Sequence, residues 1–261
     1  MIDKIKKVFE TENGKAFIPF ITAGDPDAES TVKFVLEMER AGADMIELGI
    51  PFSDPTAEGV VIQEANIRAL KGGMTTDTAF GIVEKIRAQS EIPLAFMTYI
   101  NPVFHYGYES FFAKCEELNV GAIILPDCPY EESGELKDIA ESHNVAVVTM
   151  ISPTSDDRIR RVAKDAKGFI YVVSSMGVTG VRTEFNTDLD KIVTALKNET
   201  DVPCAIGFGI STPEQAKRMA SISDGAIVGS AIVRIVAEHG RDAAPYIYEF
   251  VKSMKDAVAE A

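Results

Sequence analysis

Eight short apolar runs, rich in β-branched residues, alternate with segments of helical periodicity along the 261 residues, which predicts an α/β fold. Several runs are apolar at every position, as expected for parallel strands covered on both faces. A (β/α)8 or TIM barrel usually takes about 250 residues. No low-complexity linker divides the chain, so we expect a single (β/α)8 barrel domain over residues 1–261. A doubly wound open sheet is the alternative.

The predicted elements follow one another in regular order. The strands are expected at residues 17–22, 45–48, 94–98, 122–125, 145–150, 169–173, 204–208 and 226–228. Helical spacing of apolar residues opposite a charged face is clearest at residues 32–36, 80–86, 111–118, 159–163 and 192–196. Residues 211–214 combine a cap, a proline and an acid, which predicts a helix start, and Gly240 predicts a helix end. Additional terminal helices are expected at residues 2–10 and 243–261.

The charge of the chain bears on its partners and location. Forty acidic residues against 26 basic ones leave a formal charge of −14, the wrong sign for gathering nucleic acid or anionic lipid. The first nine residues carry charges where a signal peptide needs an apolar stretch. No later run approaches the roughly 20 apolar residues of a membrane span. We therefore expect a cytoplasmic protein with no nucleic-acid or membrane partner.

Cysteine and histidine usage argues against a metal site. Cys115, Cys128 and Cys204 share no CxxC or zinc-type spacing, so reduced thiols are expected. The three histidines are scattered, with no pair at ligand spacing. We expect no metal in this chain.

Glu47 stands inside the second apolar run, in the stretch MIELGIPFSDPTAEG. A buried carboxylate costs desolvation energy unless it is paired, and its pKa rises if it is not. A structural ion pair is the simpler interpretation of an isolated glutamate. However, the loop that follows the strand carries Asp54 and Glu58, and loops after barrel strands hold the catalytic groups. The pattern favours a site with two carboxylates.

Glycines follow three of the later strands, at residues 177–180, 207–209 and 229. Glycines allow backbone N–H groups to approach an anion, and a helix N-terminus adds about half a positive charge. Any one of these glycines could simply turn the chain. Loops after strands seven and eight are nevertheless the usual phosphate site of a barrel. An acidic protein could thus bind a phosphate without lysine or arginine.

Five motifs carry a resemblance to a known family. They are PFITAGDP at 19–26, IELGIPFSDPTAEG at 46–59, GVTG at 177–180, GFGIS at 207–211 and GSAIV at 229–233. In this order they resemble the alpha subunit of tryptophan synthase, and the first two are highly specific. The resemblance implies a (β/α)8 barrel that cleaves indole-3-glycerol phosphate to indole and glyceraldehyde 3-phosphate. It also implies a pyridoxal-phosphate-dependent beta subunit as partner, in an α2β2 heterotetramer, which receives the indole through a tunnel.

The resemblance also assigns roles to individual positions. The acid/base glutamate of the family falls on Glu47, its tyrosine beside the substrate on Tyr171, and its second catalytic carboxylate on Glu58. The implied substrate-binding residues are the indole-pocket aromatics Phe20, Tyr99 and Phe208, the loop residue Thr179, and the phosphate contacts Gly180, Gly209, Gly229 and Ser230.

Two positions in the catalytic loop depart from the family pattern. The family commonly has aspartate at the position of Glu58 and proline at the position of Val60. Glutamate keeps the charge but is longer by a methylene, and a misplacement of about 1 Å can cost roughly a hundredfold in rate.

The residues and the resemblance agree on what retro-aldol cleavage needs. The reaction requires an electron sink, and no strand ends in a lysine for a Schiff base. Indole is its own sink once C3 is protonated. Glu47 would supply or relay that proton and then take one from the glycerol hydroxyl, while Glu58 would accept a hydrogen bond from the indole N–H. The alternatives are another phosphate-binding barrel enzyme and a catalytically weak or inactive subunit that regulates the beta subunit.

Overall fold

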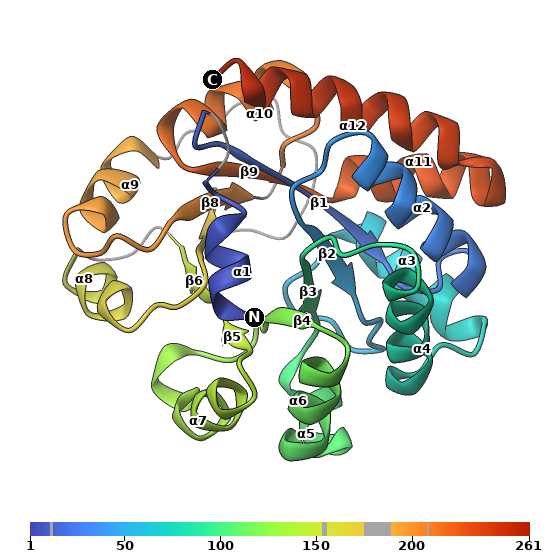
Figure 1. Ribbon diagram of the computed structural model, residues 1–261, viewed down its shortest axis with the longest axis horizontal. Coiled ribbons are helices and arrows are strands. Elements are labelled where there is room, and N and C mark those ends of the chain that lie inside the picture. The colour runs from blue at the N-terminus through green and yellow to red at the C-terminus, as the bar shows by residue number, and fades with distance from the viewer. Residues whose placement is uncertain (11–12, 153–155, 175–188, 208) are drawn as a thin grey trace.

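The centre of the molecule is a sheet of nine parallel strands, in the order β5-β4-β3-β2-β1-β9-β8-β7-β6. The computed structural model describes residues 1–10, 13–152, 156–174, 189–207 and 209–261 (Figure 1). The strands are β1 Ala16–Thr22, β2 Ile46–Gly49, β3 Leu94–Met97, β4 Val120–Ile124, β5 Ala146–Val147, β6 Thr149–Ile151, β7 Ile170–Val173, β8 Cys204–Gly207 and β9 Gly225–Val228.

The sheet closes through the two strands at the ends of this order. β5 pairs with β4 and β6 pairs with β7, yet Val148 alone separates β5 from β6 in the chain. The N–H of Val148 also bonds the Ile123 carbonyl, at 2.8 Å. The single strand predicted at residues 145–150 therefore serves both ends of the sheet. The predicted (β/α)8 barrel is confirmed, and the open-sheet alternative is wrong.

Helices surround the barrel (Figure 1). They are α1 Ile2–Lys7, α2 Ala28–Arg40, α3 Val60–Lys71, α4 Thr76–Arg87, α5 Ile100–Tyr106, α6 Tyr108–Glu117, α7 Gly134–Ser142, α8 Asp156–Lys164, α9 Leu189–Lys197, α10 Pro213–Ile222, α11 Ser230–His239 and α12 Ala244–Ala259, with 3-10 turns η1 Tyr130–Glu132 and η2 Gly240–Asp242. The described part of the chain holds no helix long and apolar enough to cross a bilayer. Sequence periodicity did not predict α3, α5 or α7.

The predicted N-terminal helix is present but shorter than expected, and it closes one end of the barrel. Ile5 of α1 is buried, and the ring of Phe9 lies 5.7 Å from that of Phe169, just before β7. A Cβ atom on Gly121, near the start of β4, would stand 2.8 Å from Ile5. Since α1 fills the end where the strands begin, chemistry is left to the end where they finish.

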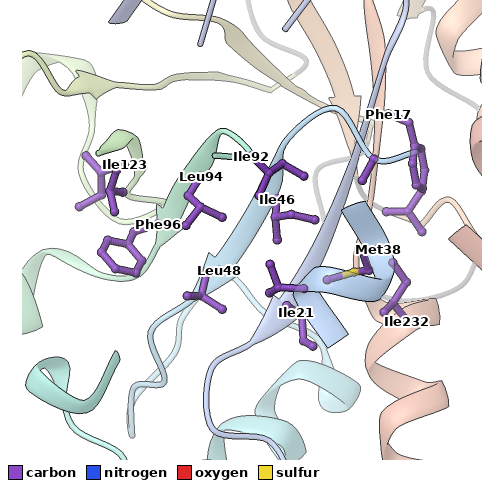
Figure 2. Packing of buried hydrophobic residues seen from close by; sticks show 14 of the residues in the cluster. Phe17, Ile21, Met38, Ile46, Leu48, Ile92, Leu94, Phe96, Ile123 and Ile232 are labelled. Carbon is purple, nitrogen blue, oxygen red and sulfur yellow. The ribbon is translucent and has the colours of Figure 1, made fainter. Parts of the chain in front are cut away.

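Alternate strand residues divide the apolar interior into two clusters. Ile46 and Leu48 belong to the outer cluster between strands and helices, together with Leu94 and Phe96 of β3 (Figure 2). Phe20 belongs to a second cluster inside the barrel. Because successive side chains of a strand point to opposite faces, the residue between Ile46 and Leu48 must point into the barrel. That residue is Glu47.

Candidate active site

Glu47 lies inside the barrel between apolar neighbours. Its register partners are Phe20 on β1 and Ala95 on β3, and the side chain is 1% exposed. Within the part of the chain that the structure describes, its Oε1 atom has no hydrogen-bond partner. Burial raises the pKa of Glu47 to about 8. A carboxyl group that is largely protonated at neutral pH can act as a general acid.

Glu58 lies in the loop just before α3 and is 5% exposed. Its Oε2 atom accepts a hydrogen bond of 2.7 Å from Nδ2 of Asn66, and its backbone oxygen accepts one of 2.7 Å from Nε2 of Gln63. Burial raises the pKa of Glu58 to about 7, although hydrogen bonds from Asn66 and Tyr99 oppose the rise. Both predicted catalytic carboxylates are thus buried, with pKa values above the usual range.

Tyr99 contacts the loop that carries Glu58. It follows β3 at the start of α5, and its hydroxyl accepts a hydrogen bond of 3.2 Å from the N–H of Ala57. The Tyr99 ring lies 5.4 Å from that of Phe52 in the same loop. Burial raises the pKa of Tyr99, so its hydroxyl stays protonated. These contacts tie Tyr99 to the Glu58 loop, and its implied place in the wall of the indole pocket stays a prediction.

Tyr171 points into the barrel from β7. It belongs to the inner cluster, and burial together with the charge of Glu47 raises its pKa. A Cβ atom on Gly207, at the end of the neighbouring strand β8, would stand 2.2 Å from the Tyr171 hydroxyl oxygen. Gly207 therefore makes room for this side chain, a role that only the folded barrel reveals.

Gly207→Ala is expected to destabilise the protein by about 1–3 kcal/mol, because the added methyl group overpacks the site against Tyr171. Urea unfolding measures the difference. Gly81→Ala, in α4, is the matched control, since a Cβ atom there meets nothing within 4 Å. Equal unfolding midpoints for wild type and Gly207→Ala would contradict the role of Gly207.

Two glycine-bearing loops stand beside these groups. Gly209 follows β8 with φ of 80°, a backbone conformation that favours glycine. Gly229 caps the N-terminus of α11, and Ser230 is the first helical residue. A Cβ atom on Gly229 would stand 3.2 Å from the Phe20 ring. The arrangement turns the positive end of the α11 helix dipole toward the cavity, which favours an anion there.

Seven of the predicted residues line one cavity. Its volume is about 40 Å³. The lining consists of Phe20, Glu47, Glu58, Tyr171, Gly209, Gly229 and Ser230, with Ile62, Met97, Ile210 and Ile227. Thr179, Gly180 and Phe208 lie outside the described residues. Neither the resemblance nor periodicity pointed to Ile62, Met97 or Asn66.

A larger cavity of about 470 Å³ lies over the ends of β4, β5 and β6. It touches the catalytic loop through Thr56 and Ala57, but neither Glu47 nor Glu58 lines it. Among the described residues, no three histidine, cysteine, aspartate or glutamate side chains gather in a metal-binding arrangement. The buried carboxylates of Glu47 and Glu58 therefore both lie in the smaller cavity.

Comparison with known proteins identifies one family along nearly the whole chain. Residues 7–259 match the family described as "Tryptophan synthase alpha chain". The chain is 50% identical to the tryptophan synthase alpha chain of Lacticaseibacillus casei over 258 residues, which cover 99% of this chain and 96% of that protein. With the relative from Lactiplantibacillus plantarum the identity is 47%, over 95% of this chain and 94% of that one.

Solved structures of similar proteins share the fold. Tryptophan synthase subunit alpha from Legionella pneumophila superposes with a TM-score of 0.88 at 33% identity, covering 100% of this chain and 98% of that one. A chain of the tryptophan synthase complex from Pyrococcus furiosus gives 0.84 at 34% identity, covering 92% and 98%. The chain therefore belongs to the tryptophan synthase alpha chain family.

Proposed function

We propose that the chain cleaves indole-3-glycerol phosphate to indole and glyceraldehyde 3-phosphate by carboxylate acid/base catalysis. One observation carries this proposal: Glu47 and Glu58 line the same cavity, both buried, with pKa values of about 8 and about 7. At neutral pH this pair supplies a proton donor and a carboxylate at one place. Retro-aldol cleavage of an indole needs both.

The proposed steps balance within the substrate and Glu47. The Glu47 carboxyl donates its proton to indole C3, and the resulting cation is delocalised onto the ring nitrogen. The C3–carbon bond then breaks, and its electron pair restores the indole. The Glu47 carboxylate takes the proton of the hydroxyl on the released carbon, which becomes the aldehyde. Glu58 accepts a hydrogen bond from the indole N–H and stabilises the positive charge as it develops.

A steady-state assay tests this proposal. Purified protein is expected to release indole from indole-3-glycerol phosphate, faster when a tryptophan synthase beta subunit is present. An inactive or weakly active chain that only regulates its partner would show no indole release alone but would still change the beta reaction. No cleavage under either condition would overturn the proposed activity.

The substrate phosphate is proposed to bind at the N-terminus of α11, beside Gly209, Gly229 and Ser230. Gly229→Val is expected to raise the KM at least tenfold, because its side chain would block the approach to the backbone N–H groups and press on Phe20. Steady-state kinetics measures the effect. Gly134→Val, at the start of α7, is the matched control, since a Cβ atom there meets nothing within 4 Å. An unchanged KM in Gly229→Val would move the phosphate elsewhere.

The proposed partner is a pyridoxal-phosphate-dependent beta subunit, and this chain is proposed to hold no cofactor itself. Val60 and Ile67 are 67% and 50% exposed and lie seven residues apart on one face of α3. Phe104, on α5, is 69% exposed. Because α3 and α5 follow the neighbouring strands β2 and β3, the starts of both helices, with Val60 as the first residue of α3, lie at the catalytic end of the barrel. Docking there would bring a partner next to the Glu58 loop. Cytoplasmic location and an α2β2 assembly stay predictions.

Phe104→Asp is expected to weaken binding to the beta subunit at least tenfold and to abolish the partner's stimulation of indole release. The basal rate should stay near that of wild type, because Phe104 does not line the cavity. Calorimetric titration and the cleavage assay measure the two effects. Tyr246→Asp is the control, since Tyr246 is a similarly exposed aromatic residue on α12, away from α5 (Figure 1). Equal partner affinity of Phe104→Asp and Tyr246→Asp would reject this surface.

A further inference from the structure

We propose that Asn66 on α3 is a positioning residue for the reaction, because its side-chain amide holds the carboxylate of Glu58 against the cavity. The inference rests on the proposed function, in which Glu58 faces the indole nitrogen. It assigns a role in that function to a residue of α3 that does not itself line the cavity.

Asn66 is buried in a place that does not favour asparagine. It is 4% exposed in the middle of α3, among the buried residues Ile62, Ala65 and Ala69. Asparagine is a weak helix former, and burying an unpaired amide costs free energy. The 2.7 Å hydrogen bond from Nδ2 to Oε2 of Glu58, a buried bond between two side chains eight residues apart, offsets this cost.

Two further contacts hold α3, the helix that carries Asn66, in place: one to Asp25 after β1 and one to the backbone of Glu58. Arg68 donates two hydrogen bonds, of 2.8 and 2.7 Å, to the carboxylate of Asp25, which follows β1 and is 1% exposed. Gln63 bonds the backbone oxygen of Glu58. An amide on an anchored helix can hold a loop carboxylate in one orientation, whereas a solvated loop glutamate would sample several rotamers.

The length of Glu58 fits this arrangement. Its extra methylene, compared with the aspartate usual in the family, lets one carboxylate line the cavity and also reach back to α3. An aspartate on the same backbone would place its carboxylate about 1.5 Å short of this position. Glu58 and Asn66 therefore form one unit.

Asn66 also acts on the charge of Glu58. An amide N–H bond stabilises the carboxylate over the carboxylic acid, which opposes the rise in pKa that burial causes. The other titratable groups around this carboxylate are Tyr99, from the end of β3, and Glu47 and Tyr171, which share the cavity from β2 and β7. Without the amide, the carboxylate form of Glu58 would require a higher pH.

The test compares Asn66→Leu with Gln63→Met across a pH series of indole release. Asn66→Leu keeps the side-chain size but removes the donor, so kcat should fall at least tenfold. The rising limb of the pH profile should also move to higher pH. Gln63→Met removes an amide from the same helix whose one hydrogen bond, among the described residues, is to a backbone oxygen, so the rising limb of this variant should stay in place. Asn66→Ser, which restores a short donor, should recover part of both losses even if Asn66→Leu folds poorly.

Each outcome bears on the inference. An active wild type with kcat and rising limb unchanged in Asn66→Leu overturns the inference and leaves the proposed function intact. Equal limb shifts in Asn66→Leu and Gln63→Met would also overturn it, because the effect would then come from α3 in general. A wild type that does not cleave the substrate overturns the proposed function, and the inference with it.

Discussion

Glu47→Gln is expected to lower kcat for indole release by at least about 100-fold, because glutamine has no proton to give to indole C3. The fold should persist. At neutral pH the carboxyl, with a pKa of about 8, is mostly uncharged, and the amide has nearly its shape. The affinity for phosphate, measured by its competition with the substrate, should therefore be unchanged. Near-normal turnover in Glu47→Gln would show that another group supplies the proton.

The pH profile gives this prediction a second readout. Cleavage needs Glu58 as carboxylate and Glu47 as acid, so the rate should rise through about pH 7 and fall through about pH 8. The falling limb belongs to Glu47 and should be absent from the residual activity of Glu47→Gln. A falling limb that survives the substitution would assign it to a different group.

The free energy of unfolding should depend on pH through Glu47, and the pKa shift fixes the direction of this dependence. The pKa of Glu47 is about 8 in the folded protein but near 4.5 when unfolded, so the folded state binds the extra proton between these values. Stability is therefore lost as pH rises from about 4.5 to 8, at up to roughly 1.4 kcal/mol per unit. Glu47→Gln does not have this loss. The difference in free energy of unfolding between the variant and wild type should therefore shift in favour of the variant by on the order of 3 kcal/mol from pH 5 to pH 8. Urea unfolding at the two pH values checks this.

The barrel and the position of Glu47 followed from local patterns. Strands that are apolar at every position and alternate with helices leave few architectures. A glutamate flanked by Ile46 and Leu48 must face opposite to them, and register with Phe20 then places it inside the barrel. Gly209 and Gly229 likewise follow β8 and β9, as the order of the motifs predicted, whereas residues 177–180 lie outside the described part of the chain. In each case the order of the strands determines which residues lie next to one another.

The contacts that hold Glu58 could not be predicted in this way. Asn66 within a helix looks like an exposed polar residue, and only the folded loop shows that it is buried against Glu58. Tyr99 likewise acts on a loop more than forty residues earlier in the chain. The split of residues 145–150 into β5 and β6 also depends on partners at both ends of the sheet. These features arise from tertiary contacts, which periodicity does not encode.

Val60, the second departure from the family pattern, has a local explanation. It is the first residue of α3 and is 67% exposed. Proline is well tolerated at the first helical position, because the N–H that it lacks would have no partner within the helix. Valine and proline are therefore both compatible with the first position of this helix.

Glu58→Ala is expected to lower kcat by about two orders of magnitude or more, comparable to the loss of one preorganised group that stabilises transition-state charge. The rising limb of the pH profile near pH 7 should disappear with it, since that limb reports the pKa of Glu58. The assay should be run with the beta subunit present, where the site is expected to be complete. A Glu58→Ala variant as active as wild type in that complex would remove Glu58 from the mechanism.

Glu58→Asp keeps the carboxylate but shortens the side chain by one methylene, so it tests the effect of side-chain length apart from that of charge. It restores the residue usual in the family, but the shorter side chain should lose either the cavity or the 2.7 Å bond from Asn66, so activity should fall despite the retained charge. In the double variant Glu58→Asp/Asn66→Leu, the second substitution should cost little more, because the bond that it removes is already broken. Val60→Pro, combined with Glu58→Asp, tests whether a stiffer helix start brings the aspartate back into place. Full additivity of Glu58→Asp and Asn66→Leu would show that the two side chains act independently, and that the longer carboxylate is not matched to α3.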